Sequence, residues 1–463
     1  MTTIPFILLF LPLSLAIYYI AGQKAKEYIL LAVSLAFYSM FSLEYIALFV
    51  IEIILTVTIG RLINRNKTAS SGKALLVTGI VLNVVLLAFY KYFNSIMGLF
   101  ASGDEIPSIA LPLGISFFTF KAISYLTDVY KGTAVLTSNP VHDALYLSFF
   151  PQVQAGPITR YSGLSRFDHI DGKLIIGGGF RFLIGFCKKI LISNVLSKIT
   201  VEVFAAPLES FSVSYAWIGS VCFSLQLLFD FAGYSDMAIG ISQMFGYHCI
   251  ENFDYPYMTE SVSKFWRRWH ISLSQWFRDY IYIPMGGSRT KNKWRVYFNL
   301  LVVWVLTGIW HGSTWNFVIW GLGYFAAISF ERLTGLPDRF KHKWAKFIYR
   351  IFSLLFINFL WVIFNSDNIK SGLGFIKRMF ICTNNELTDL RTLFFLRNYG
   401  LFIAIAVILC FPLVPWLDKK LKGKKTAHII FKAVTAAIVL FAFIWALSFV
   451  IAGLNNPFAY GNF

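Results

Sequence analysis

The chain has 463 residues, of which 57% are hydrophobic and only 14% are charged, whereas about 25% of the residues in an average soluble domain are charged. Its formal net charge is +18 at pH 7, but the basic residues stand in short clusters between long apolar runs. These features exclude a soluble protein and a nucleic-acid-binding protein. They predict an all-α polytopic membrane protein embedded in lipid.

About 20 apolar residues in a helix cross a bilayer. Helices of this kind are expected at residues 4–20, 28–42, 45–60, 75–100, 109–130, 212–229, 296–330, 349–366, 399–417 and 426–452. The basic loops 61–73 and 419–425 are expected to face the cytoplasm, which places the N-terminus and the residues after Asn455 outside. The longest segment expected outside, 367–398, is too short to bury a core of its own.

The region between residues 140 and 210 is less regular, because short apolar pieces alternate with basic residues. The stretches "GPITRYSGL" and "GGGF" are expected to interrupt any helix there, which favours re-entrant or interfacial helices. No internal repeat and no soluble domain is visible. We therefore expect one membrane domain over residues 1–463, with N-terminal helices (1–110), a motif-rich catalytic core (111–330) and C-terminal helices (331–463).

The stretch "VSKFWRRWHISLSQWFRDYIYIPMGGSR" (262–289) combines tryptophans, basic residues and one histidine. Drawn as a helix, its aromatic and leucine side chains, including Trp269, fall within about 120° of one another. This pattern predicts an amphipathic helix over 264–280 that lies along the cytoplasmic interface. On helix geometry alone, His270 is expected to be tucked at that interface with a hydrogen-bonded neighbour.

A second histidine stands in a longer apolar run. From Val296 to Phe330 there is no Asp, Glu, Lys or Arg, and His311 is the one side chain that titrates near neutral pH. An ionisable residue at such depth costs several kcal/mol unless it is neutral and partnered, which makes it a functional candidate. Basic residues on both flanks predict two short helices that meet at "HGSTWN", with His311 at the deep turn. A neutral structural histidine that bridges two helices is the alternative.

Other polar residues of the apolar runs are expected to be structural. Asp230 and Asp236 are isolated carboxylates that could cap helices, bind a partner histidine or face a water-filled cavity, and a structural role is favoured for both. Lys121 and Asp128 are expected to form a buried pair or to face a cavity. The histidines show no metal-ligand spacing, so no metal is expected. No nucleotide-binding or nucleophile-elbow motif is present, and no permanently bound cofactor is expected. With these motifs absent, acid–base or nucleophilic catalysis by a histidine is the chemistry that the sequence still offers.

Several long motifs occur in a fixed order along the chain. They are "LPLGISFFTF" (111–120), "FFPQVQAGPITRY" (149–161), "FDFAGYSDMAIG" (229–240), "ENFDYPY" (251–257), "FWRRWHISLSQWFRDYIYIPMGG" (265–287), "GIWHGSTWNFVIWG" (308–321) and "PFAY" (457–460). In this order they resemble the membrane-bound O-acyltransferase family and, within it, the branch of alginate O-acetyltransferase membrane subunits.

The resemblance carries expectations for fold and site. It implies a ring of tilted transmembrane helices, with re-entrant and interfacial helices, around a central tunnel. It implies that His311 is catalytic and that His270 is a second functional histidine on the reaction path. The side chains expected to line the substrate path are Trp310, Trp315, Asn316 and Trp269. The Asn316 amide is a candidate donor to a developing oxyanion.

The resemblance also implies a reaction. A cytoplasmic thioester, acetyl-CoA or an acetylated carrier, would supply acetyl groups that cross the bacterial plasma (inner) membrane for O-acetylation of alginate, peptidoglycan or a similar cell-surface glycan. His311 would act as a general base or be acylated briefly. A separate extracytoplasmic partner of the SGNH esterase-like type is expected to serve the polysaccharide acceptor. The alternatives are a teichoic acid D-alanyl transferase and, from another class, a polysaccharide exporter or flippase.

Overall fold

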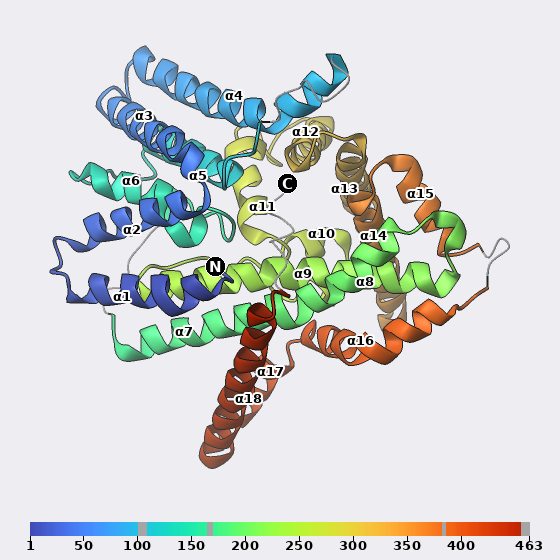
Figure 1. Ribbon diagram of the computed structural model, residues 1–463. Coiled ribbons are helices and arrows are strands. Elements are labelled where there is room, and N and C mark those ends of the chain that lie inside the picture. The colour runs from blue at the N-terminus through green and yellow to red at the C-terminus, as the bar shows by residue number, and fades with distance from the viewer. Residues whose placement is uncertain (101–108, 164–169, 382–385, 455–463) are drawn as a thin grey trace.

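The computed structural model describes residues 1–100, 109–163, 170–381 and 386–454, and every regular element in these ranges is a helix (Figure 1). In this part of the chain, six helices are long and apolar enough to cross a membrane. They are Leu43–Arg65, Ser70–Gly98, Val213–Met244, Lys343–Asn365, Leu390–Leu409 and Lys425–Ile451. The predicted all-α polytopic class is confirmed. The tunnel and the orientation of the chain stay predictions, and residues 455–463, with the "PFAY" motif, lie outside the described residues.

The first third of the chain forms helices where its apolar runs predict them. They are η1 (Phe6–Phe10), α1 (Leu11–Ile20), α2 (Lys26–Phe41), η2 (Leu43–Tyr45), α3 (Ile46–Arg65), α4 (Ser70–Phe100) and α5 (Ile115–Lys131). Short elements follow: α6 (Pro140–Ser148), η3 (Phe150–Gln152) and η4 (Tyr161–Gly163). The expected buried pair does not form, because Asp128 accepts a hydrogen bond from Tyr280 at 2.8 Å while the Lys121 ammonium lies over the ring of Tyr146.

The prediction that two stretches interrupt helices is confirmed for the described part of "GPITRYSGL", residues 156–163, and is wrong for "GGGF". α7 (Gly172–Cys187), the π-helix η5 (Lys188–Ser193) and α8 (Asn194–Ala205) follow one another without a break. A Cβ atom added at Gly178 would lie 2.6 Å from the carbonyl oxygen of Gly240, and one at Gly185 would lie 2.5 Å from that of Gly233. The glycines therefore let α7 lie directly against the backbone of α9 (Val213–Met244), a packing that small residues allow between membrane helices.

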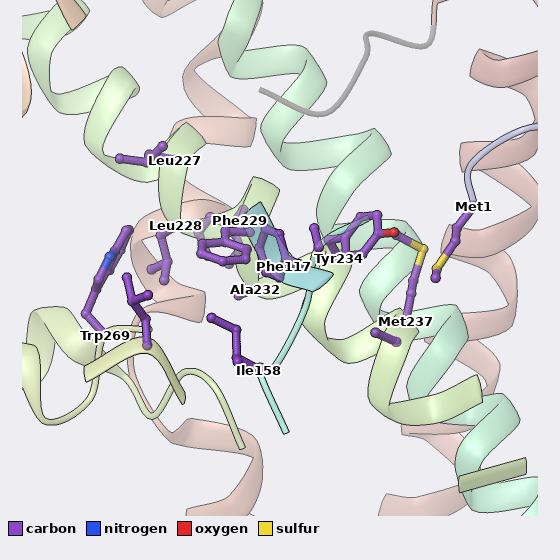
Figure 2. Packing of buried hydrophobic residues seen from close by; sticks show 14 of the residues in the cluster. Met1, Phe117, Ile158, Leu227, Leu228, Phe229, Ala232, Tyr234, Met237 and Trp269 are labelled. Carbon is purple, nitrogen blue, oxygen red and sulfur yellow. The ribbon is translucent and has the colours of Figure 1, made fainter. Parts of the chain in front are cut away.

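The long helix α9 runs through the middle of the molecule (Figure 1). The prediction of a helix over 212–229 ends it 15 residues too early. Most of its side chains are buried, and Figure 2 shows Leu227, Phe229, Tyr234 and Met237 of this helix within the packed interior, together with Ile158 and Trp269. α9 thus supports the segment that carries His270, whose ring centroid lies 4.5 Å from that of Phe231 on α9.

The two carboxylates in the unpredicted half of α9 are neutralised by the neighbouring helical run. Lys189 forms a buried ion pair with Asp230. Arg181 and Lys188 bind Asp236 at 2.9 and 2.7 Å. A buried charge is tolerated when it is paired and hydrogen-bonded, which explains why the helix continues past both residues. The predicted structural role of both aspartates agrees with this geometry.

The rest of the chain first forms short elements and then longer helices. The short ones are η6 (Leu208–Ser210), which precedes α9, and η7 (Pro256–Met258), α10 (Val262–Trp266), α11 (Ile271–Phe277) and η8 (Arg278–Tyr282), which follow it. The longer ones are α12 (Lys293–His311), α13 (Trp315–Thr334), α14 (Lys343–Asn365), α15 (Ile369–Arg378), α16 (Leu390–Leu409), α17 (Leu413–Leu421) and α18 (Lys425–Ile451).

The predicted helix over 399–417 is wrong in its position and its continuity. α16 begins nine residues earlier, where the Asp389 side chain accepts a hydrogen bond from the backbone N–H of Thr392 at 2.8 Å and caps the helix. It ends before Pro412, which has no N–H to donate to the preceding turn. α17 and α18 extend away from the rest of the molecule (Figure 1), and most apolar side chains of α18 are exposed, as in a helix that faces lipid.

Candidate active site

His311 is the last residue of α12, and the chain turns at once into α13. The predicted hairpin of two helices is confirmed, since α12 and α13 pack against each other. They approach closely because glycines face the partner backbone: a Cβ atom at Gly308 would lie 2.5 Å from the carbonyl oxygen of Phe317, and one at Gly321 would clash with that of Trp304. The imidazole is thus fixed at the closed end of a tight hairpin.

Aromatic rings enclose the imidazole of His311, which is 1% exposed. The ring centroids of Trp310, Trp320 and Phe364 lie 4.6, 4.9 and 5.1 Å from its own. Trp320 and Phe364 stand nearly perpendicular to it, in the edge-to-face geometry that aromatic pairs prefer. Such an enclosure keeps water away and strengthens any charge interaction made inside it.

The structure brings only one of the predicted wall residues of this motif into contact with the histidine, and that is Trp310. Trp315 is 72% exposed and does not line the enclosure. Asn316 is buried, but its amide nitrogen donates to the backbone oxygens of Ile363 at 3.3 Å and Ser366 at 2.8 Å. It therefore ties the start of α13 to the end of α14, and the amide proposed for an oxyanion is occupied.

Helix α4 covers the turn that follows His311. The hydroxyl of Tyr92 donates to the carbonyl oxygen of Ile309, and the hydroxyl of Ser95 donates to that of Ser313 at 2.8 Å. These two hydrogen bonds grip the chain on both sides of His311. Contact between residues more than 200 positions apart cannot be read from helix patterns, and the sequence did not indicate it.

A lysine of α4 reaches the same place. The ammonium of Lys91 lies over the ring of Trp310, 5.3 Å from its centroid. Trp310 in turn packs against the imidazole of His311, with ring centroids 4.6 Å apart. The sequence did carry a signal for Lys91: it is the one charged residue between Ala74 and Phe100, and an isolated charge inside a membrane helix marks a functional candidate.

The second histidine lies on a broken segment, so the continuous amphipathic helix predicted over 264–280 is wrong. α10 ends at Trp266, α11 begins after His270, and His270 itself has a φ of 42°, in the left-handed region. Such a conformation is uncommon for a residue with a side chain and is held by its surroundings. Trp269 and His270 are both fully buried, whereas Arg267 and Arg268 beside them are exposed, so the segment turns its histidine into the protein and its arginines outward. Its predicted place at the cytoplasmic interface stays a prediction.

A neighbouring loop holds the break open. The backbone N–H of Asp254 donates to the carbonyl oxygen of Arg268, and that of Ile271 donates to the carbonyl oxygen of Asn252, both at 3.0 Å. These tertiary hydrogen bonds replace bonds that a continuous helix would have made within itself. Hydrophobic periodicity reports only which side of a helix is apolar. It carries no information on a loop elsewhere in the chain that competes for the backbone hydrogen bonds, and it therefore predicts an unbroken helix.

Asn252 also fixes the ring of His270. Its side-chain oxygen accepts from the backbone N–H and the hydroxyl of Ser272 at 3.2 and 2.9 Å, and it lies 3.2 Å from Nδ1 of His270. A backbone N–H only donates, so this Asn252 atom is the oxygen, and an amide oxygen only accepts. Nδ1 therefore carries the proton and Nε2 the lone pair. The Asn252 amide nitrogen donates to Ser235 of α9 at 3.1 Å.

We expect Asn252→Ala to lower the activity of the protein about tenfold, because the ring of His270 loses the contact that sets its tautomer and orientation. The substitution also leaves the buried N–H of Ser272 without its acceptor, which costs about 1–3 kcal/mol of stability. The rate is measured in membranes with equal amounts of folded protein. Asn358→Ala is the matched control, since that buried amide bonds to Ser220 and Ser224 of α9 instead. Equal losses in both variants would show that Asn252 is only structural.

The two histidines lie at the edges of one aromatic cluster. The ring of Trp269 is 5.1 Å from that of Trp361, which is 5.9 Å from that of Trp320, and Trp320 contacts His311. The predicted residue Trp269 thus packs into the same wall from the His270 side. In the residues the structure describes, no group of three or more His, Cys, Asp or Glu side chains is arranged to hold a metal ion.

Comparison with known proteins identifies a family and several relatives to which the chain is similar. A model of the MBOAT, membrane-bound O-acyltransferase family, matches residues 137–372. The probable alginate O-acetylase AlgI of Azotobacter vinelandii is 35% identical over 440 residues, 91% of this chain and 86% of that protein. The peptidoglycan O-acetyltransferase of Helicobacter pylori is 34% identical over 414 residues, 81% and 78% of the two chains. The teichoic acid D-alanyltransferase of Bacillus subtilis is 32% identical over 225 residues, 45% of this chain and 56% of that protein.

The helices define a polytopic membrane protein whose interior holds two buried histidines. The chain belongs to the membrane-bound O-acyltransferase family. It is an O-acyltransferase, and the family predicted from the motifs is confirmed. The exporter or flippase alternative has no support, because the relatives are named as acetylases and acyl transferases.

Proposed function

We propose that this enzyme takes acetyl groups from a cytoplasmic thioester, acetyl-CoA or an acetylated carrier, and passes them across the bacterial plasma (inner) membrane for O-acetylation of an extracytoplasmic polysaccharide. One observation carries the choice of an acetyl group. Similarity to the alginate O-acetylase and to the peptidoglycan O-acetyltransferase extends over more than four fifths of the chain, whereas similarity to the D-alanyltransferase covers less than half.

The enclosure around His311 supports a direct transfer. An acceptor hydroxyl attacks the thioester carbonyl carbon, and His311 takes the hydroxyl proton as the new C–O bond forms. The C–S bond then breaks, and the departing thiolate receives the proton from the imidazolium. Alternatively, the imidazole nitrogen attacks first, the thiolate leaves, and the acceptor hydroxyl displaces the imidazole in a second step. Both routes need an imidazole shielded from water, since water would hydrolyse the thioester or the acyl group.

His270 has a supporting place in this proposal. Its ring is oriented by Asn252 with the lone pair on Nε2, so it is set to accept a hydrogen bond or a proton. It shares the aromatic wall with His311. We assign it to the reaction path as an aid to the acceptor or the donor, and not as the primary base.

The burial of His311 also supports a partner protein. A polysaccharide chain cannot reach an imidazole that is 1% exposed and enclosed by rings. A small acyl group can be brought to it and carried away from it. We therefore assign the last step, placement of the acetyl group on the sugar, to a separate extracytoplasmic protein of the SGNH esterase-like type.

The identity of the donor tests this function. Purified protein in lipid vesicles is offered acetyl-CoA, an acetylated carrier protein or a D-alanylated carrier protein, each with a soluble hydroxyl acceptor, and the release of free thiol is followed. We expect turnover with one of the two acetyl donors and none with the D-alanyl donor. His311→Ala is the control that shows the thiol release to be enzymatic. Turnover with the D-alanyl donor alone would replace the proposal by its runner-up.

A further inference from the structure

Lys91 is a cation without the environment that a buried cation needs. Its Nζ atom is shielded from solvent and has no hydrogen-bond partner among the residues described. Its one favourable contact is the face of Trp310, at 5.3 Å. A cation–π contact offsets only part of the hydration that an ammonium loses on burial. Lys189, by contrast, is buried against the carboxylate of Asp230.

The position of this ammonium is fixed at the reaction centre. Trp310, over which it lies, also stacks against His311 with ring centroids 4.6 Å apart. Tyr92 and Ser95, the next residue and the next turn of α4, are hydrogen-bonded to Ile309 and Ser313 on either side of the histidine. The helix that carries Lys91 therefore cannot slide relative to His311 without breaking both bonds.

A buried ammonium that has no carboxylate partner can stabilise negative charge that develops on the substrate during the reaction. In a dry site a fixed positive charge stabilises developing negative charge far more than it would in water. Acyl transfer creates such a charge on the carbonyl oxygen of the donor. The amide of Asn316, the other candidate donor for that oxygen, is occupied by backbone carbonyls of residues 363 and 366.

We propose that Lys91 Nζ receives the carbonyl oxygen of the acyl donor and stabilises the oxyanion that forms on it. The inference rests on the proposed function of His311. As the acceptor oxygen bonds to the carbonyl carbon, His311 takes the hydroxyl proton and the C=O electron pair moves onto the oxygen beside the Lys91 ammonium. When that pair returns, the C–S bond breaks and the thiolate takes the proton from His311. Lys91 keeps its protons throughout and serves as a catalytic residue through its charge.

A purely structural role makes a different prediction. If the contact with Trp310 only fastens α4 to α12, loss of Lys91 lowers stability and leaves the turnover of the remaining folded enzyme intact. If the ammonium meets the oxyanion, loss of its charge lowers kcat and leaves the donor KM nearly unchanged, because the interaction exists only in the transition state.

The experiment compares full-length variants in lipid vesicles with acetyl-CoA, or with the acetylated carrier if that is the active donor, and measures kcat, KM and thermal stability. We expect Lys91→Met, which keeps the aliphatic stem, to lower kcat about 100-fold or more and to change KM less than threefold. Lys91→Arg, which keeps the charge, should recover at least tenfold of that loss. Lys26→Met is the matched control, since Lys26 is also buried and lies 5.1 Å from the ring centroid of Tyr18, and it should turn over like the natural enzyme.

Three outcomes would overturn the inference: an unchanged kcat in folded Lys91→Met, an equal loss in the Met and Arg variants, or a loss that follows stability alone. If Lys91→Met is not recovered folded, Lys91→Gln is measured in the same way, and full activity of that neutral side chain would refute the role of the charge. His311→Ala is run in parallel. Activity in His311→Ala would refute the proposed function itself, whereas an inactive His311→Ala with an active Lys91→Met would refute only the role of Lys91.

Discussion

His311→Ala is expected to abolish O-acetylation while the protein still inserts and folds. General-base catalysis by a histidine contributes about 100- to 10,000-fold to a rate. In our proposal Lys91 keeps its protons and His270 has only a supporting role, so neither replaces His311 as the base inside the enclosure of Trp310, Trp320 and Phe364. The acetyl content of the surface polysaccharide in cells that express the variant is the readout. Wild-type acetylation at equal protein levels would remove His311 from the mechanism.

Two companion variants make this result specific. Removal of the imidazole from its aromatic enclosure leaves a cavity, which lowers stability. His311→Gln fills more of that volume, so it should be as inactive as His311→Ala but more stably folded. His428→Ala replaces a histidine whose partner is Asp418 at the junction of α17 and α18, and it should acetylate normally. His270→Ala should weaken activity and spare part of it, since we assign that ring a supporting role.

The sequence was sufficient for the features that depend on local pattern. Apolar runs predict the membrane helices of the first third because each run is long and bounded by loops with basic or turn-forming residues. His311 emerges from its own surroundings, since it is the single titratable group in a run from Val296 to Phe330 whose ends are both basic. The hairpin follows from the same charges, because a helix that starts and ends near the cytoplasmic side must turn inside the membrane.

The features that the sequence did not reveal depend on contacts between distant segments. The helix expected over 264–280 is broken because its backbone groups at Arg268 and Ile271 form hydrogen bonds with the loop at Asn252 and Asp254. No residue inside the segment indicates these bonds. The glycines of α7 were read as helix breakers, yet they are contact points with Gly233 and Gly240 of α9. The sequence alone does not show whether a glycine breaks a helix or allows close packing of two helices. The structure of the partner helix decides between these two roles.

The site was therefore only half visible. The motifs point to His311, His270 and Trp310 as candidate site residues, but Asn252, which orients His270, lies 18 residues away in the chain. Lys91 lies more than 200 residues before His311, which it approaches over the ring of Trp310. Trp315 and Asn316 were included because they follow the histidine in sequence. Helix α13 begins at Trp315, and it turns Trp315 outward and Asn316 toward α14.

We expect the purified enzyme, reconstituted in vesicles with radiolabelled acetyl donor on the cytoplasmic side only, to deliver label to a polysaccharide on the far side only when the extracytoplasmic partner is present. In the proposed relay the donor is a cytoplasmic thioester, and its large, charged carrier stays on that side. A two-carbon acetyl group is small enough to pass. Because the imidazole of His311 is 1% exposed, we expect the polysaccharide to receive the acetyl group through the proposed partner and not from His311 directly.

The expected result has three parts, and each serves as a control for the others. With enzyme and partner together, labelled ester accumulates on the far-side polysaccharide and free CoA accumulates on the donor side in equal amounts. With enzyme alone, the polysaccharide stays unlabelled. With the His311→Gln enzyme and the partner, neither product forms, which shows that leakage of donor across the vesicle does not supply the partner. Efficient labelling of the polysaccharide without a partner would refute the relay, because the enzyme would then reach the sugar by itself. Absence of label on the far side with both proteins present and folded would refute transfer across the membrane, and the acetyl group would have to be accepted on the side on which it is made.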